Sequence, residues 1–280
     1  MHRIRLVSVL PAIVLAACSG PVATPGAGPV PELRPGIPAG YLSRDALPDS
    51  LALLPPPPAS GSGALAADEE AYRSGRQFKG TARWDQAITD SNLRFPAAAG
   101  AFACALGASV SEKATPRLYL LLRRSMIDAG LATYAAKNHW ARIRPFAVHK
   151  EASCTPGEEA ALAKEGSYPS GHAAIGWTWA LVLAELSPAR TDLLLARGRD
   201  FAQSRSVCGV HWQSDIQAGQ SIAAGVVARL HADATFQADL QAAGQELIRA
   251  AETQPVLEKD CSADTKAATS TARSARPAER

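Results

Sequence analysis

The sequence lacks the features that mark several common classes of protein. Its formal net charge is only +3 over 280 residues, which is too small to indicate a nucleic-acid-binding surface. It has no His-x3-His pair, no Cys-x2-Cys pair and no carboxylate cluster to complete a metal site. Little period-two alternation of apolar and polar residues is present, so extended strands are not expected. No internal repeat is present either.

The sequence also lacks a long apolar run after its N-terminal region. Residues 175–186 are almost wholly apolar, but a helix that crosses a bilayer needs ~20 such residues. We therefore expect this run to be a helix buried on all sides and the folded domain to be soluble.

The residue pattern from about Asp68 onward predicts helices. Thr115-Pro116 and Ser187-Pro188 each place an N-cap residue before a proline, which is a typical helix start. Residues 216–230 are apolar and rich in alanine and glycine, which suits close helix packing. The sequence therefore predicts one all-α domain, a compact helical bundle.

The N-terminus predicts export. Arg3 and Arg5 precede a short apolar run at residues 6–17, as in a secretory signal. Residues 15–18 resemble the bacterial lipobox, in which the cysteine, here Cys18, becomes the lipidated first residue. The alternative is a simple signal cleaved near Ala17. With Ser19 after the cysteine, the resemblance implies a periplasmic protein that is lipid-anchored to the outer membrane.

Composition divides the chain into four parts. We expect a signal at 1–17, a flexible Pro/Gly/Ala tether at 18–40, the catalytic domain at 41–255 and a mostly disordered tail at 256–280. The four prolines at 55–58 favour an extended conformation. They form either an arm across the domain or merely more linker.

Cysteine usage agrees with an oxidising compartment. If Cys18 carries lipid, four cysteines remain, and they allow three pairings. We favour Cys154–Cys208, because both flank motifs that must meet in space, which leaves Cys104–Cys261. The alternative is that one or more of the four stay reduced and buried.

Three motif segments hold the residues with chemical potential. The first has Lys137 and Arg144-Pro145, the second has Pro169-Ser170-Gly171-His172, and the third has Ser204-Arg205, His211 and Asp215. Arginine can offer a fork of donors to two phosphate oxygens, and lysine is a compact point charge. A Ser-Gly turn adds a hydroxyl and backbone N–H groups. These are the groups needed to bind a phosphate and to attack its phosphorus atom.

The two histidines can divide the roles of nucleophile and acid. Asp215 is four residues after His211, so the two side chains share a face if the intervening residues are helical. The carboxylate would then fix the imidazole tautomer, which makes His211 the nucleophile candidate. His172 has no such carboxylate and is the general-acid candidate. Alternatively, His211 and Asp215 are a structural pair or two metal ligands, although no further ligands accompany them.

The motif spacings match those of the type 2 phosphatidic acid phosphatase superfamily. Its pattern is K-x6-RP, then PSGH, then SR-x5-H-x3-D, and all three segments fit. Residues 166–172, which read GSYPSGH, resemble the signature of the bacterial class A non-specific acid phosphatases. That signature continues with Thr where this chain has Ala173, and the family usually has Asp where this chain has Asn138. The resemblance extends over residues 41–255.

This resemblance implies an exported acid phosphatase of broad specificity for small-molecule phosphomonoesters. It implies a phosphohistidine at His211 that Asp215 orients, with His172 as general acid and then base. The phosphate ligands would be Lys137, Arg144, Ser170, Gly171 and Arg205. No metal or other cofactor is expected, and a homo-oligomer is plausible. The alternatives are a vanadium-dependent haloperoxidase, phosphotransfer at the same site, and a non-enzymatic surface lipoprotein that binds phosphorylated ligands.

Overall fold

The computed structural model describes residues 30–256 and 261–274, and this part of the chain is helical apart from one small hairpin. The predicted signal and Cys18 lie outside the described residues. The hairpin joins β1 (Glu32–Arg34) to β2 (Ile37–Pro38) in antiparallel fashion. The α-helices are α1 (Ser50–Leu53), α2 (Gly63–Arg76), α3 (Ala82–Asp90), α4 (Ala103–Leu106), α5 (Pro116–Leu131), α6 (Tyr134–Trp140), α7 (Pro145–His149), α8 (Glu159–Leu162), α9 (Gly171–Leu186), α10 (Thr191–Val207), α11 (Gln213–Leu230), α12 (Ala234–Thr253) and α13 (Ser262–Ser274). Short 3-10 turns lie at Arg44–Ala46, Ala97–Phe102, Pro156–Glu158 and Pro188–Arg190.

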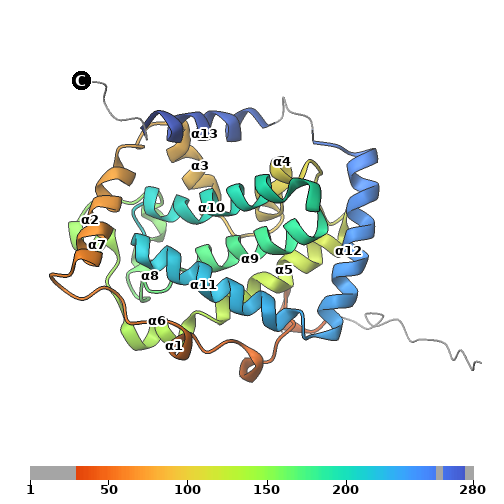
Figure 1. Ribbon diagram of the computed structural model, residues 1–280, viewed down its shortest axis with the longest axis horizontal. Helices are drawn as coiled ribbons and strands as arrows, with labels where there is room; N and C mark the ends of the chain where they lie inside the picture. Colours follow the sequence, from red (N-terminus) through yellow and green to blue (C-terminus); the bar gives the residue numbers. More distant parts are fainter. Residues whose placement is uncertain (1–29, 257–260, 275–280) are drawn as a thin grey trace, which may run out of the picture.

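Helix α9 is the centre of the bundle. It packs against α10, α11 and α5, while α12 runs across one end of these helices (Figure 1). Trp179 on α9 is fully buried, and its indole N–H donates to the carbonyl of Leu122 on α5 at 2.9 Å. The prediction that this apolar run is a buried helix is confirmed. The all-α prediction is confirmed as well.

Helices α9 and α11 approach each other closely because small residues line their contact. A Cβ atom added at Gly219 of α11 would collide with the carbonyl oxygen of Ser170 and lie 3.1 Å from the Cβ of Ala173. The glycine therefore sets the distance between α11 and the start of α9. No helix of the described residues has the length and apolar character needed to cross a bilayer.

The two predicted helix starts differ in detail from the expectation. Helix α5 begins at Pro116 as predicted, but the Thr115 hydroxyl bonds to the backbone of Ser111 instead of capping the helix. After Ser187, the chain first makes a 3-10 turn at Pro188–Arg190, and α10 begins only at Thr191.

The predicted tether does not reach residue 40, because residues 32–38 form the hairpin. The side chain of Arg123 donates to the carbonyl of Gly36 at 2.6 Å, and that of Arg124 donates to the carbonyls of Ala39 and Gly40 at 3.1 and 3.0 Å. This segment supplies backbone acceptors to two arginines of α5. It therefore folds against the bundle despite a composition that could not fold alone.

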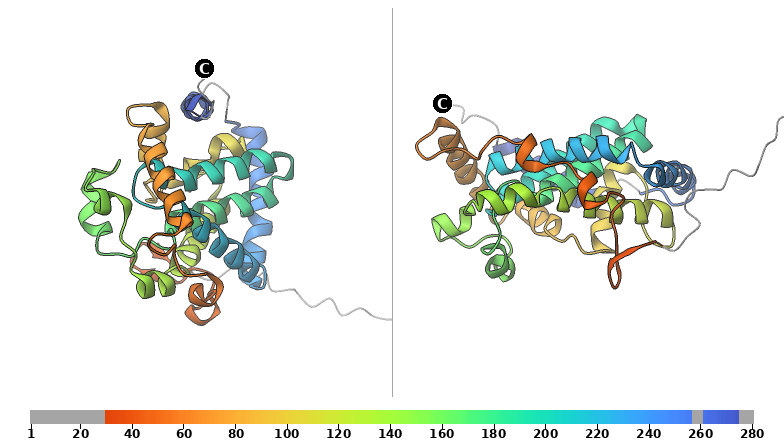
Figure 2. Two further views of the ribbon diagram at one scale, coloured as in Figure 1. Left: turned by 60° about the vertical axis from the view of Figure 1, so that its left-hand side comes forward. Right: turned by 90° about the horizontal axis from the view of Figure 1, so that it is seen from below.

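The predicted disorder of the C-terminal tail is also corrected. Residues 262–274 form α13, which lies beside α3 (Figure 1) and is seen end-on in the left-hand view of Figure 2. A Cys104–Cys261 disulfide joins this tail to α4, and Ala267 is buried. The Cys154–Cys208 disulfide is present too, so both favoured pairings are confirmed. The disulfide and the buried Ala267 hold a tail whose composition is typical of disorder.

The polyproline segment lies against the second motif segment. Residues 55–58 form neither helix nor strand. The carbonyl of Pro55 accepts a hydrogen bond from the Tyr168 hydroxyl at 2.8 Å, and Leu54 is buried. This contact agrees with an arm across the domain.

Candidate active site

The first motif segment places two cations beside the third. Lys137 is buried on α6, and its ammonium donates to the carbonyl of Gly166 at 2.9 Å. Arg144 immediately precedes α7 and is also buried. Its guanidinium donates to the carbonyls of Leu162 and Val210 at 2.8 and 3.1 Å, and it contacts His211 Nε2 at 2.9 Å.

The second motif segment opens α9. Ser170 is the N-cap, and its hydroxyl accepts from the backbone N–H of Ala173 at 3.2 Å. The Ser170 N–H donates to the carbonyl of Asp215 at 2.9 Å, which connects this turn to the third segment. Gly171 is the first residue of the helix. The N-terminus of α9, whose free N–H groups favour a negative charge, therefore lies at the junction of the segments.

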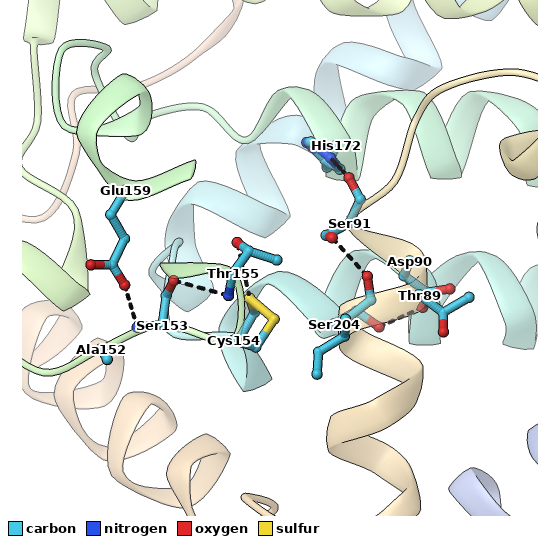
Figure 3. Close-up of a disulfide and its surroundings, with 12 residues drawn as sticks. Thr89, Asp90, Ser91, Ala152, Ser153, Cys154, Thr155, Glu159, His172 and Ser204 are labelled. Atoms are coloured by element: carbon cyan, nitrogen blue, oxygen red, sulfur yellow. Dashed lines mark hydrogen bonds between the residues drawn. A yellow bond between two sulfur atoms is a disulfide. The ribbon is translucent and has the colours of Figure 1, made fainter. Parts of the chain in front are cut away.

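The ring of His172 is fixed by the end of α3. Its Nε2 lies 3.0 Å from the carbonyl oxygen of Ser91 (Figure 3). A carbonyl can only accept, so Nε2 carries the hydrogen and Nδ1 is the nitrogen that can gain or release a proton. Asp90, the preceding residue, accepts from the Ser204 hydroxyl of α10 at 2.6 Å. The third segment thus holds the stretch of backbone that orients the general-acid candidate.

Arg205 is the least satisfied group of the site. It is completely buried, yet Nε, Nη1 and Nη2 have no hydrogen-bond partner among the residues that the structure describes. A buried donor without a partner is costly, and a charged one more so. Ser204, its neighbour in the motif, instead bonds to Asp90 and to Arg83, the latter at 2.9 Å. Ser204 therefore joins α10 to α3.

His211 and Asp215 meet by a route that the sequence did not predict. Helix α11 begins only at Gln213, so His211 precedes the helix and the two residues do not share a helical face. Asp215 lies in the first turn and accepts from the backbone N–H of Trp212 at 2.8 Å. The same oxygen lies 3.4 Å from His211 Nδ1. The carboxylate therefore caps the helix and faces the ring at once.

The contacts of His211 define its tautomer. A guanidinium has donors only, so Nε2 beside Arg144 must be the acceptor. The hydrogen is then on Nδ1, which faces the Asp215 carboxylate. This arrangement leaves the lone pair of Nε2 on the side of the phosphate-ligand candidates.

Sequence reasoning missed two further partners of Asp215. The hydroxyl of Ser167 donates to Oδ2, and Arg142 donates to Oδ1 at 2.7 Å. Both residues lie within a few positions of motif residues, in the segments 166–172 and 137–145. Their nearness in sequence to the motif residues is the one feature that could have suggested a role for them.

Known proteins share much of this sequence. Residues 118–237 match the model of the PAP2 superfamily. A non-specific acid phosphatase of Providencia stuartii is 46% identical over 210 residues, which cover 75% of this chain and 85% of the relative. The chain belongs to the PAP2 superfamily. An acid phosphatase of Zymomonas mobilis is 43% identical over 202 residues, 72% of this chain and 76% of the relative. A non-specific acid phosphatase of Salmonella typhimurium is 42% identical over 195 residues, 69% of this chain and 78% of the relative.

Burial and mutual repulsion set the charges of this PAP2 site. Burial, with repulsion from Arg144, lowers the pKa of Lys137 to about 7 and that of Arg205 to about 10. Burial and Arg144 also lower the pKa of His211 well below its usual value, and burial and Arg205 do the same for the pKa of His172. Both rings are therefore neutral near pH 7 unless an anion joins the cations.

The side chains at the two departures from the class A pattern make none of these polar contacts. Ala173 is fully buried and packs in a small apolar cluster with Ala202 and Ile216. Asn138 is exposed on α6, where it lines a cavity of about 720 Å³ together with Tyr134 and the segment 44–51. Neither change alters a phosphate-ligand candidate of the PAP2 pattern.

The described residues contain no group of three or more His, Cys, Asp and Glu side chains arranged to hold a metal ion.

Proposed function

We propose that this PAP2 protein is an exported acid phosphatase that hydrolyses small phosphomonoesters through a phosphohistidine at His211, without a metal ion. The observation that carries the proposal is the hydrogen-bond pattern of His211. Nε2 presents its lone pair beside the Arg144 guanidinium, and Nδ1 faces the buried carboxylate of Asp215. Phosphoryl transfer needs this arrangement, in which a carboxylate orients the nucleophile and a cation that can bind the phosphoryl oxygens lies beside it. The acid phosphatases among the relatives support the same activity.

The reaction can be written with the chain's own groups. His211 Nε2 attacks phosphorus, a P–N bond forms and the P–O bond to the alcohol breaks. His172 gives its Nδ1 proton to the leaving oxygen. Water then attacks phosphorus, passes a proton to His172 and breaks the P–N bond. Throughout, Lys137, Arg144 and Arg205 offset the charge on the phosphoryl oxygens, which is the role that magnesium has in kinases.

Buried Arg205 is well suited to this role. Its unpaired nitrogens would each gain an acceptor in a phosphoryl oxygen, and charge-assisted bonds of this kind are the strong ones. Ser170 and Gly171 would add the N-terminal N–H groups of α9.

The decisive experiment combines activity with trapping of the intermediate. We expect release of p-nitrophenol from p-nitrophenyl phosphate at mildly acidic pH, unchanged by a chelator. Rapid quench in base of the reaction with labelled substrate should give a phosphoenzyme whose label is stable to base and is lost on later exposure to acid, as for a phosphorylated histidine. His211→Ala should abolish it. A phosphoenzyme that survives this substitution would refute the assignment of the nucleophile, and loss of activity with the chelator would refute metal independence.

Export and lipidation of Cys18 are part of the same proposal and rest on the sequence of the N-terminal region up to Ser19. The two disulfides support an oxidising compartment. Metabolic labelling with a fatty acid should mark the wild-type protein in the membrane fraction, whereas Cys18→Ala should remain unlabelled. Equal labelling of the two proteins would contradict the anchor.

A further inference from the structure

A second buried carboxylate lies behind the pair formed by Arg142 and Asp215. Asp68, on α2, accepts from Arg142 Nη2 at 2.7 Å and from the backbone N–H and hydroxyl of Ser214 at 2.8 and 2.6 Å. The other edge of the guanidinium donates to Asp215 Oδ1 at 2.7 Å and to the Ser214 hydroxyl at 2.8 Å. The four residues form a closed network. Asp68 lies outside the stretch that matches the superfamily model, residues 118–237.

The charges in this network have a direct consequence for the neighbouring ring. Arg142 alone would neutralise Asp215, but the guanidinium is shared with Asp68, so the three groups carry a net charge of −1. The ring of His211 faces three cations, Lys137, Arg144 and Arg205, which disfavour any positive charge on it. That ring becomes cationic when Nε2 bonds to phosphorus while Nδ1 keeps its hydrogen. The net negative charge behind Asp215 opposes the cations at that moment.

Burial strengthens the charge interactions in this network. Asp68 is 2% exposed and Asp215 is fully buried, so solvent screens their interactions weakly. The guanidinium carbon of Arg142 also lies 5.2 Å from the ring centroid of Trp212, the residue between Asp215's helix and His211. Arg142 is thus held by two carboxylates and an aromatic face.

We propose that Asp68 and Arg142 are positioning residues for the nucleophile: Asp68 shares the charge of Arg142, so that Asp215 retains the orientation and the negative charge that stabilise a phosphorylated His211. This inference rests on the proposed function, since it requires phosphoryl transfer to that ring. Neither residue contacts the phosphate-ligand candidates through an identified hydrogen bond, so their effect is on the chemical step and not on substrate affinity.

The first test is Asp68→Asn, which keeps the shape of the side chain and removes its charge. Coupling within such a network corresponds to a rate effect of about tenfold. We expect phosphoenzyme formation in rapid-quench experiments to slow by about this factor, with KM little changed and phosphoenzyme breakdown not slowed. Asp68→Glu, which restores the charge, should recover part of the rate.

The second test follows the titration of His211 itself by NMR with ¹⁵N-labelled histidine. Asp68→Asn should lower the His211 pKa, because the full charge of Arg142 then acts on Asp215. Arg142→Gln should raise it, because a cation is lost. Opposite shifts from two partners of one ion pair are not expected from a role in folding alone. If Asp68→Asn fails to fold, the Arg142→Gln titration still tests the sign.

Asp239→Asn provides a matched control. Asp239 is buried on α12, lies 3.5 Å from Arg124 Nη1 and accepts from the Tyr41 hydroxyl at 2.9 Å. It is thus a second buried Asp–Arg pair that holds an N-terminal segment, but it belongs to another part of the bundle. We expect this variant to lower the melting temperature while leaving the phosphorylation rate and the His211 titration unchanged.

The outcomes separate this inference from the proposed function. Suppose that the wild type forms a phosphoenzyme and His211→Ala does not, while Asp68→Asn keeps the wild-type phosphorylation rate and His211 titration. This result would leave the proposed function intact and overturn the inference. The inference is also overturned if Asp68→Asn merely lowers the melting temperature, as the control does. Absence of a phosphoenzyme in the wild type refutes the proposed function instead.

Discussion

Replacing Arg205 with methionine should stabilise the protein in phosphate-free buffer and strongly weaken phosphate binding. The guanidinium is completely buried, and none of its three nitrogens has a hydrogen-bond partner among the described residues. Replacement of buried charged groups by apolar residues of similar volume is neutral or stabilising by about 1–4 kcal/mol. For a domain of this size, a gain of about 2 kcal/mol raises the melting temperature by roughly 4–8 °C.

The loss of phosphate affinity follows from the same bonds. A guanidinium fork can donate two charge-assisted hydrogen bonds, each of about 1.5–3 kcal/mol. Their removal should weaken the binding of inorganic phosphate by at least about a hundredfold. Thermal unfolding with increasing phosphate measures both effects, because a ligand that binds only the folded state raises the melting temperature with its concentration.

Arg197→Met is the matched control for this experiment. Arg197 lies on the same helix, α10, and is also buried, but it donates to both oxygens of Asp90 and to the carbonyl of Ala101. Its replacement strands a buried carboxylate and should cost about 3–5 kcal/mol. The reasoning is refuted if Arg205→Met melts well below the wild type in phosphate-free buffer, or if phosphate still stabilises it at wild-type concentrations.

Three further predictions concern the lysine, a helix contact and a disulfide. The pKa of Lys137 is lowered to about 7, so the free site loses a positive charge as the pH rises through 7. The inhibition constant of phosphate should therefore increase by up to about tenfold per pH unit in this range. Lys137→Met should flatten this dependence in the same inhibition assay. Gly219→Ala should lower activity on p-nitrophenyl phosphate and cost about 1–3 kcal/mol in urea unfolding, since its Cβ would collide with the Ser170 carbonyl. Gly225→Ala is the control: it lies on the same helix, and its Cβ would have no neighbour nearer than 3.4 Å, so activity should be unchanged and stability should rise by roughly 0.5–1 kcal/mol. Joint replacement of Cys154 and Cys208 by serine opens a loop with a sequence separation of 54 residues and should reduce the free energy of unfolding by about 4 kcal/mol; wild-type urea stability of this variant would contradict that expectation.

The sequence was sufficient to predict the helical class and to indicate that the three motif segments lie close together. Composition alone identified α9 as a buried helix, because its apolar residues continue around all sides and cannot face water. The motif spacings matched a known family. In the structure, Arg144 of the first segment contacts His211 of the third, and the Ser170 N–H of the second donates to the carbonyl of Asp215 of the third. The roles of His211 and His172 remain predictions until an intermediate is trapped.

Other features could not be read from local pattern because they depend on distant partners. Helix spacing suggested that His211 and Asp215 share a helical face, but the capping bond from Trp212 to Asp215 begins the helix after His211. The hairpin at 32–38 and the residues after it contact α5, where Arg123 donates to the carbonyl of Gly36 and Arg124 donates to that of Ala39. Asp68 lies in a surface-like run of charges in the sequence, and only the fold shows that it is buried against Arg142.

The several bonds of Asp215 limit how the protein can change over evolution. One carboxylate begins α11 through the Trp212 N–H, accepts from Ser167 and Arg142, and faces His211. A lineage that abandons catalysis is free to replace His211. Loss of Asp215 would also remove the start of a core helix and leave the half-buried guanidinium of Arg142 with one carboxylate fewer. Descendants of this protein that no longer hydrolyse phosphate should therefore have lost the histidine while retaining the aspartate.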